Sequence, residues 1–250
     1  MFRDRPITPV NGMTDGLHAL VTGTSSGIGL AIAQRLLEQG YSVTGICRRG
    51  QTDALRHDNF CAEVIDLADL GALETRLKTI LETREIDCFI HAAGQGYFGS
   101  IEQFSVAQIE KSIRVNLVSG MVICRGLLPG LRRHGAGRIV FIGSEAALQA
   151  GRKGALYSAA KFGLRGFCLA LREDCASDGI QVSLVNPGMV RSPFFDELPF
   201  APGAAAENAI EVTDVAEVVA QILNTSPHIV IDEINLSPRI KSINFGNKTD

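Results

Sequence analysis

The sequence lacks any apolar segment of the length that crosses a membrane. No run of roughly 18 apolar residues occurs in the chain, and its first residues carry charges and prolines where a secretory leader needs an apolar stretch. These absences argue against a transmembrane helix and a signal peptide. We therefore expect a soluble, unprocessed, cytoplasmic protein without a membrane partner.

The sequence also lacks an excess of charge of one sign and any paired cysteine motif. Charged residues make up 20% of the chain and the formal net charge is -3, so nucleic acid is not an expected partner. The six cysteines are scattered through apolar segments without a CxxC pair. This spacing disfavours a disulfide framework or a metal site and predicts buried free thiols in a reducing compartment.

Short apolar runs alternate with longer stretches of helical period, which is the pattern of βαβ units on a parallel sheet. After a polar tail over residues 1–16, the sequence predicts one α/β domain over residues 17–250. The fold class is a doubly wound Rossmann-type domain, with helices on both faces of a parallel sheet of about seven strands. We expect strands near 17–22, 41–46, 60–65, 86–91, 137–142, 180–185 and 229–235.

Several residues mark expected helix ends. The first helix should cover about residues 26–39, before Gly40, which suits a left-handed C-cap. Ser105 with Gln108 reads as a capping box that opens a long helix. That helix should end or kink at Pro129.

Residues 192–210 combine phenylalanines, prolines and a run of alanines without a clear period. A long irregular segment within a compact domain is commonly functional, so we expect a lid over the substrate. After it, Thr213 is predicted to cap the helix that carries Val215 and Val219.

The stretch "VTGTSSGIG" at residues 21–29 follows the first predicted strand and opens the first predicted helix. Its glycines allow a tight turn, and the helix N-terminus attracts phosphate. The turn could instead be only a tight connection, but it lacks the Gly-Lys-Ser/Thr ending of a nucleotide kinase loop. The predicted cofactor contacts in this turn are Gly23, Ser25, Ser26, Gly27 and Ile28.

Two arginines follow the second predicted strand, where the adenosine ribose of a dinucleotide would lie. An acidic residue there would bind a free 2′-hydroxyl, whereas an arginine would pair with a 2′-phosphate. The sequence has Arg48 and Arg49 at this point and no acid. We therefore predict NADP(H) over NAD(H), against the alternative that both arginines are solvated loop residues.

Tyr157 and Lys161 have the i, i+4 spacing that places two side chains on one helix face. A nearby ammonium favours an ionised phenol and should lower the pKa of Tyr157 toward working pH, which suits a general acid and base. Alone, the spacing could arise by chance between a buried tyrosine and a surface lysine.

Two further polar residues strengthen the catalytic interpretation. Ser144 follows the strand "GRIVFIG", so it should project at the carboxyl edge of the sheet, where ligands bind in such folds. Asn116 lies in the predicted helix "SIRVNLVSG", where an amide could relay protons through water. Alternatively, Ser144 is a helix cap and Asn116 a polar residue on a solvated turn.

Together these motifs resemble the short-chain dehydrogenases/reductases, over about residues 17–240. The resemblance implies a catalytic set of Asn116, Ser144, Tyr157 and Lys161. Beyond the glycine-rich turn and the two arginines, it implies cofactor contacts at Tyr157, Lys161, Asp66, Leu67, Ala93, Gly94, Pro187, Gly188, Val190 and Ser192. Two residues depart from the family pattern: His91 stands where asparagine is frequent, and Ser192 replaces a threonine.

The resemblance implies an NADP(H)-dependent oxidoreductase that transfers a hydride between the nicotinamide and a carbonyl or alcohol. Ser144 would bind the substrate oxygen and Tyr157 would exchange its proton. Lys161 would hold the ribose and keep Tyr157 acidic, while Asn116 would position a water. The alternative is a catalytically silent NADP(H)-sensing module, although such proteins typically lose these residues. Extended nucleotide-sugar enzymes are disfavoured by the chain length.

The substrate is a small carbonyl or alcohol molecule whose class the sequence leaves open. Phe98, Phe194 and Phe195 argue for an apolar pocket, whereas Arg152 and Arg191 could clamp a carboxylate. The segment "SPHIVIDEINLSP" near the C-terminus is loosely similar to NADP-dependent 3-hydroxy acid dehydrogenases, so 3-hydroxy acids are a lead.

The resemblance also implies a homo-oligomer, a tetramer or dimer, formed through two long helices. Small residues on the second of these helices would permit close approach, or could pack within the subunit: Ala159, Gly163 and Ala170.

Overall fold

Seven parallel strands form the central sheet of the computed structural model, which describes residues 16–50 and 53–246. The predicted tail 1–16 thus lies almost wholly outside the described residues. The strand order is β10 (Glu233–Leu236), β6 (Ile180–Pro187), β5 (Gly137–Ile142), β4 (Cys88–His91), β1 (His18–Thr22), β2 (Ser42–Cys47) and β3 (Phe60–Val64). Because the winding reverses between β1 and β4, a ligand crevice is expected there at the carboxyl ends of the strands. The doubly wound α/β prediction is confirmed.

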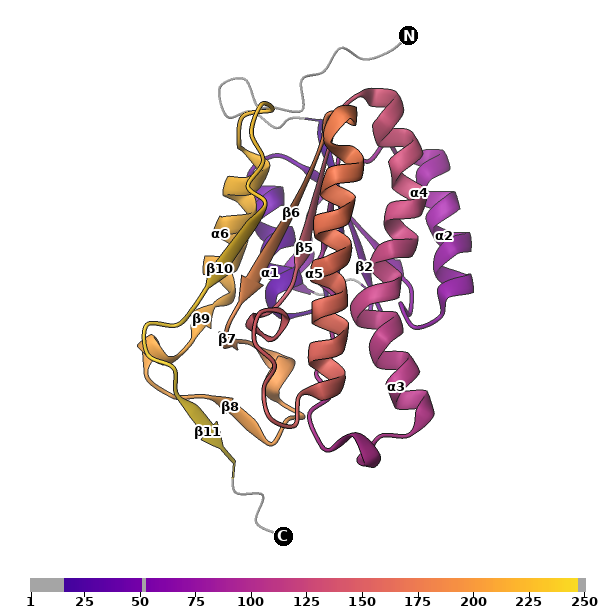
Figure 1. Cartoon of the computed structure of the whole chain (residues 1–250). Helices are drawn as coiled ribbons and strands as arrows, with labels where there is room; N and C mark the ends of the chain where they lie inside the picture. The colour runs from indigo at the N-terminus through magenta and orange to yellow at the C-terminus, as the bar shows by residue number, and fades with distance from the viewer. Residues whose placement is uncertain (1–15, 51–52, 247–250) are drawn as a thin grey trace.

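Helices cover both faces of this sheet (Figure 1). On one face lie α1 (Gly27–Glu38) and α6 (Val212–Leu223), and on the other lie α2 (Leu70–Thr83), α4 (Ser119–His134) and α5 (Ala155–Cys175). Successive strand residues such as Leu20 and Val21 enter opposite cores. This double burial explains why the strands read as nearly continuous apolar runs.

The long helix before β5 has three parts. α3 (Val106–Ile113) opens at the predicted capping box, in which Ser105 Oγ accepts from the Gln108 N–H at 3.2 Å and Gln108 Oε1 accepts from the Ser105 N–H at 2.9 Å. A π-helical turn at Arg114–Val118 then leads into α4. The predicted end or kink at Pro129 is wrong as an end, because α4 runs through this exposed proline to Gly135. Packing of α4 residues against the core on both sides of the proline sustains the helix.

Two other predicted ends need correction. Thr213 is not the cap of α6, because Glu211 caps it in a capping box with Asp214. Glu211 belongs to β9 (Ile210–Glu211), whose pairing with β7 (Val190–Arg191) fixes where the helix begins. The last sheet strand also begins later than predicted, at Glu233. The end of α1 before Gly40, with φ of 87°, is as predicted.

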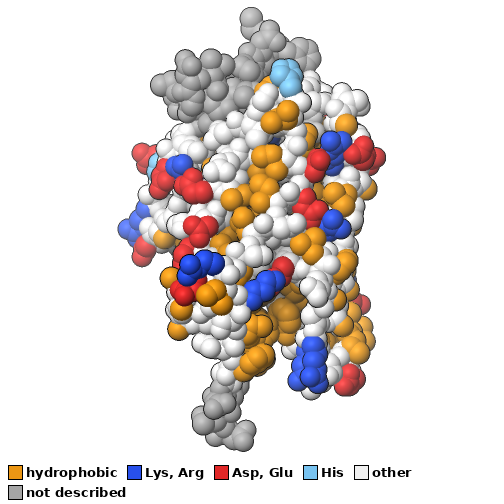
Figure 2. Space-filling view, turned by 60° about the vertical axis from the view of Figure 1, so that its left-hand side comes forward, with side chains coloured by type: hydrophobic (Ala, Val, Ile, Leu, Met, Phe, Trp, Pro, Cys, Tyr) orange, Lys and Arg blue, Asp and Glu red, His pale blue; other side chains and the backbone are white. Residues whose placement is uncertain are grey.

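The predicted lid, residues 192–210, contains short elements: 3-10 turns at Pro193–Phe195 and Ala206–Asn208, and the strand β8 (Phe200–Pro202). β8 pairs antiparallel with β11 (Ile243–Phe245) near the C-terminus. We call residues 239–245 the C-terminal strap. Figure 1 shows β8 and β11 together at the lower end of the molecule. At that end, Figure 2 shows hydrophobic side chains gathered on the surface.

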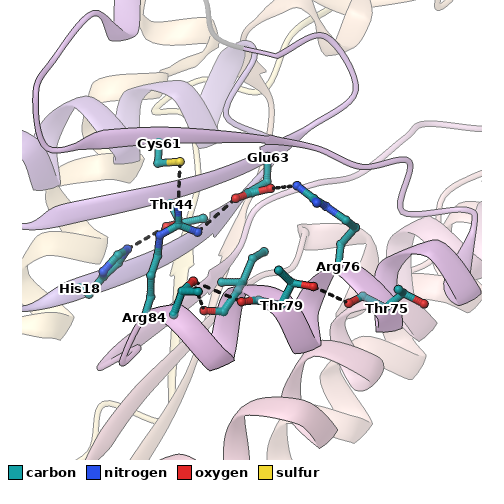
Figure 3. A network of polar contacts seen from close by, with 10 residues as sticks. His18, Thr44, Cys61, Glu63, Thr75, Arg76, Thr79 and Arg84 are labelled. Atoms are coloured by element: carbon teal, nitrogen blue, oxygen red, sulfur yellow. Dashed lines mark hydrogen bonds and ion pairs between the residues drawn. The ribbon is translucent and has the colours of Figure 1, made fainter.

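A polar network away from the crevice joins α2 to β3 (Figure 3). The buried carboxylate of Glu63 accepts from Arg76 at 2.6 Å and from Arg84 at 3.1 Å. Arg84 also donates to the Cys61 sulfur at 3.1 Å. These two arginine partners explain why the acid Glu63 is buried on the edge strand β3, so a catalytic role is not needed to account for it.

All six cysteines are free thiols, five of them buried and Cys61 half-buried. Within residues 16–50 and 53–246, no helix is both long and apolar enough to cross a membrane. The same residues contain no group of three or more His, Cys, Asp or Glu side chains placed to hold a metal ion.

Candidate functional site

The glycine-rich turn leads from β1 into α1 and is shaped by close backbone approach. A Cβ at Gly29 would lie 2.4 Å from the Gly23 carbonyl oxygen, and one at Gly23 would lie 3.0 Å from Ala93. Both positions therefore require glycine. Ser26 caps α1 without a side-chain hydrogen bond, so the first-turn N–H groups are left for a ligand. The turn fits a bound phosphate.

The ends of β2 and β3 carry the predicted ribose and adenine contacts. Arg48 and Arg49 are both exposed, and the guanidinium of Arg49 reaches Ser25 Oγ in the glycine-rich turn at 3.5 Å. Asp66 is exposed and accepts from the Ala68 N–H at 3.0 Å. Leu67 is buried in the core, so only its backbone can face a ligand.

The nicotinamide end of the predicted site follows β6. A Cβ at Gly27 would lie 3.5 Å from Cβ of Ser192, so this residue faces the glycine-rich turn across the crevice. Val190 is buried, and its carbonyl accepts from Ser192 Oγ at 3.3 Å. A hollow of about 320 Å³ adjoins this point, large enough for a small ligand. It is lined by Arg191, Ser192, Phe195, Asp196, Ala201 and Pro202.

Ser144 lies at the carboxyl end of β5, as predicted. It also caps the turn Glu145–Ala147, where its Oγ accepts from the Ala146 N–H at 3.1 Å, so both interpretations of this residue hold. Its own N–H donates to Asn186 Oδ1 at 3.2 Å. The position of Ser144 therefore depends on Asn186.

A network that sequence reasoning missed holds Asn186. Its Nδ2 donates to Asn235 at 3.0 Å and to Glu233, whose carboxylate accepts two bonds of 2.9 Å from Arg165 on α5. A Cβ at Gly143 would lie 2.1 Å from Asn186 Oδ1, so only glycine fits there. We call this network the catalytic floor: Ser144, Asn186, Glu233 and Arg165. The only sequence signal was an asparagine directly before the Pro187-Gly188 pair.

Tyr157 and Lys161 share the buried face of α5, as predicted. The expected lowering of the tyrosine pKa is wrong for the chain alone. Burial raises the pKa of Tyr157 to about 12, and hydrogen bonding to Ser144 lowers it only in part. Burial also lowers the pKa of Lys161 to about 8. The lysine Nζ donates to the Ile142 carbonyl at 2.9 Å and lies 5.7 Å from the tyrosine ring centre.

Asn116 lies in the π-helical turn, a feature frequent at functional sites. Its Oδ1 accepts from the Gln95 N–H at 3.0 Å, and its Nδ2 donates to the carbonyls of Gln95 and Ser112 at 3.0 and 2.9 Å. The amide thus holds the backbone after β4. A Cβ at Gly94 would lie 3.0 Å from Asn116 and 3.7 Å from Lys161, so the predicted residues converge here.

His91 is fully buried at the end of β4. Thr22 Oγ1 accepts the N–H groups of Ala92 and Ala93 at 3.1 Å each, which leaves its proton for His91 Nδ1, also at 3.1 Å. The ring is therefore neutral, with its proton on Nε2. Burial and the charge of Lys161 lower the pKa of His91 to about 3.

Aromatic rings gather around Tyr157. The ring centres of Phe98 and Phe194 lie 5.1 and 5.8 Å from that of Tyr157, as expected for pocket-lining residues. Sequence reasoning missed Phe200, whose ring centre is 4.9 Å from that of Phe98. We call these rings the aromatic roof: Phe98, Phe194, Phe195 and Phe200.

The predicted carboxylate clamp is only partly available. Arg191 donates to Glu211 at 3.1 Å and to the carbonyls of Gly203 and Ala205, so it ties the lid together. Arg152 lies on the exposed turn before α5.

The helix surface predicted to mediate oligomerisation is partly packed within the subunit and partly exposed. A Cβ at Gly163 would meet Leu117 at 2.9 Å, so this glycine packs within the subunit. Ala159 and Ala170 are exposed. The homo-oligomer stays a prediction.

Comparison with known proteins agrees with this geometry. The sequence model of the family described as short chain dehydrogenase matches residues 17–200. An uncharacterized oxidoreductase of Staphylococcus epidermidis is 28% identical over 225 residues, covering 88% of this chain and 96% of that protein. An NADP-dependent 3-hydroxy acid dehydrogenase of Salmonella typhi is 28% identical over 236 residues, covering 89% and 95%.

A solved structure is also similar. A metagenomic short-chain oxidoreductase in complex with NADP has a TM-score of 0.76 and 28% sequence identity. The alignment covers 91% of this chain and 99% of that one.

Proposed function

Because the chain belongs to the short-chain dehydrogenase family, we propose that it is an NADP(H)-dependent oxidoreductase acting on a carbonyl or alcohol group. The observation that carries this proposal is the convergence of Ser144, Tyr157 and Lys161 at the carboxyl ends of β4 and β5. Tyr157 packs against the rings above it, and Lys161 lies next to Gly94, within reach of the crevice.

The crevice fits a phosphorylated dinucleotide. Gly23 and Gly29 allow the tight turn that presents backbone N–H groups to a pyrophosphate at the N-terminus of α1, and Arg48 and Arg49 supply positive charge nearby. The NADP complex of the metagenomic relative supports the same cofactor. When bound, NADPH supplies the hydride that reduces the carbonyl carbon.

The chain's own residues manage the substrate oxygen and its proton. Ser144 Oγ donates a hydrogen bond to the carbonyl oxygen, and Tyr157 donates the proton that completes the alcohol. The pKa of about 12 keeps the Tyr157 phenol protonated before turnover. Lys161, buried next to Gly94, would hold the ribose hydroxyls of the bound cofactor and stabilise the phenolate after proton transfer. Asn116 fixes the backbone at Gly94 and Gln95 around that lysine.

The test follows NADPH oxidation against a panel of ketones, aldehydes and 3-oxo acids, with NADP⁺ and 3-hydroxy acids for the reverse direction. We expect turnover that falls by about 1000-fold in Tyr157→Phe, the scale of general acid and oxyanion contributions, while NADPH affinity is retained. Tyr97→Phe is the matched control, since that ring contacts Phe104 rather than Ser144. Full activity in Tyr157→Phe would refute the assignment.

Cofactor choice is tested separately by titrating NADPH and NADH. Arg48→Ala should weaken NADPH binding by about 10- to 100-fold and leave NADH unchanged, because a bidentate phosphate contact is lost. Arg56→Ala, an exposed arginine paired with Asp53, is the control. Equal affinity of the unchanged protein for both cofactors would contradict the NADP(H) proposal.

A further inference from the structure

We propose that the substrate is a neutral carbonyl compound whose substituent is an apolar ring, received by the aromatic roof above Tyr157. This inference rests on the proposed function and names the substrate class of the same site.

The first step is the packing of the roof on the catalytic residue. Phe98 and Phe194 come from separate segments, the loop after β4 and the lid, and both contact the Tyr157 ring. A carbonyl oxygen that reaches the Tyr157 hydroxyl must therefore carry its substituents against these rings. Such rings favour flat apolar groups that pack against them in an offset-stacked or edge-to-face arrangement.

The second step is the continuity of the roof beyond Tyr157. Phe200 meets Phe98 edge to face, at 4.9 Å and 88°, and Phe195 lies 5.1 Å from Phe194 and 5.8 Å from Phe200. With Tyr157, these rings form a closed chain of contacts, so a substrate ring would be received by displacing one edge contact. Gly96 lets Phe194 and Phe98 pack this closely on the backbone, because a Cβ there would lie 2.7 Å from Phe194 and 3.0 Å from Phe98.

The third step is the charge around the roof. Three basic side chains of the lid and the strap each have a carboxylate partner: Arg191 with Glu211, Arg239 with Glu207, and Lys241 with Glu145. The hollow beside the roof is lined by one acid, Asp196, and by one base, Arg191, whose charge is already paired with Glu211. An anionic substrate would therefore lose hydration there without gaining an unpaired cation.

One competing source of positive charge is Arg152 on the exposed turn before α5. A 3-hydroxy acid, the substrate class in the name of the Salmonella relative, would need a cation of this kind to hold its carboxylate. A neutral ring-bearing substrate and an anionic substrate therefore predict different effects of Arg152→Ala on turnover.

The experiment compares benzylacetone with levulinate, two methyl ketones that differ by a phenyl ring in place of a carboxylate, and uses butanone as the unsubstituted reference. We expect kcat/KM with NADPH to be about 100-fold higher for benzylacetone than for levulinate, from burial of the ring. Arg152→Ala should change neither value by more than about 2-fold, since an exposed charge contributes little.

Variants of the aromatic roof test whether these rings cause the preference for benzylacetone. Phe200→Ala should lower kcat/KM for benzylacetone by about 10-fold more than kcat/KM for butanone, because only benzylacetone carries a ring for Phe200 to contact. Phe245→Ala is the matched control, since Phe245 pairs with Phe200 in the β8–β11 ladder but its side chain is 74% exposed.

The outcomes separate this inference from the proposed function. Preference for levulinate or a 3-hydroxy acid, lost in Arg152→Ala and dependent on Tyr157, would overturn the neutral-ring substrate and leave the oxidoreductase in place. Equal turnover of all three ketones would also overturn it. Absence of turnover of every carbonyl and alcohol, with NADPH bound, would overturn both.

Discussion

The catalytic floor and the aromatic roof meet at Tyr157 but are held by different forces. The floor is polar: hydrogen bonds run from Ser144 through Asn186 to the ion pair of Glu233 and Arg165. The roof is apolar and is carried by a lid whose strand β8 pairs with the C-terminal strap. Directional bonds fix one geometry, whereas ring contacts tolerate several. From this difference we expect the floor to set the chemistry and the roof to set the choice of substrate.

Among the variants that separate floor from roof, the largest expected effect comes from Gly143→Ala. The added methyl would collide with Asn186 Oδ1 and displace the N–H contact of Ser144. We expect a loss of about 1–3 kcal/mol in unfolding free energy and a fall in kcat of about 100-fold or more. Denaturant unfolding and initial rates measure both.

The matched control is Gly151→Ala, at a glycine with nothing within 4 Å of its Cβ position. It should behave as the unchanged protein. A stable, fully active Gly143→Ala would show that the floor does not set the chemistry.

Glu233→Gln weakens the floor without creating a clash. The ion pair with Arg165 would be lost, and a neutral amide with one accepting oxygen would replace the carboxylate that accepts from Arg165 and Asn186, so Ser144 would be held less firmly. We expect kcat to fall by about 10-fold with KM for NADPH unchanged, the signature of a positioning residue. Asp232→Asn, which loses only the exposed pair with Arg172, should leave kcat unchanged. A rise in KM alone would assign Glu233 to cofactor binding.

Acid should destabilise the folded chain through His91, at the end of β4. The unfolded chain takes up a proton at His91 below about pH 6.5, whereas the folded chain does so only near pH 3, so stability falls as pH decreases through this window. Between about pH 7 and pH 5, protonation of this histidine in the unfolded chain lowers the free energy of unfolding by about 2 kcal/mol.

Replacing the histidine tests this assignment. His91→Asn should flatten the pH dependence of unfolding free energy over that range by the same amount. His18, whose pKa burial lowers to about 4, keeps a similar slope in the variant and serves as the internal reference. An unchanged pH profile in His91→Asn would assign the acid sensitivity elsewhere.

The smallest effect is expected in the C-terminal strap, which holds the lid that carries part of the roof. Lys241→Ala removes the 2.6 Å ion pair with Glu145, which is largely exposed and therefore stabilises by at most about 1 kcal/mol. Hydrogen exchange at the Gly203 N–H, which donates to the strap at Ser242, should become faster while kcat for butanone is retained. Lys241→Arg keeps the charge and should preserve the slow exchange. Loss of kcat in Lys241→Ala would show that the roof and the floor do not act independently.

Local spacing predicted much of the fold and part of the site. Tyr157 and Lys161 share a helix face because four residues complete about one turn, and Ser144 falls at a strand end because its strand is continuous and apolar. The glycine-rich turn is likewise set by neighbours in sequence.

What sequence could not predict depends on contacts between distant segments. Asn186 and Glu233 are 47 residues apart, and Arg165 and Glu233 are 68 apart, so no local pattern joins them. The start of α6 at Val212 follows from pairing of β9 with β7. The raised pKa of Tyr157 follows from burial under a lid whose position only the folded chain defines.

Antiparallel pairing of β8 with β11 also separates the stability of the cover from that of the sheet. The seven strands of the main sheet all precede residue 237, whereas Phe200 lies on a two-stranded ladder that joins residues 200–202 to residues 243–245. Two-stranded ladders are marginally stable by themselves. Local opening of this ladder would therefore uncover the site while the nucleotide crevice stays folded.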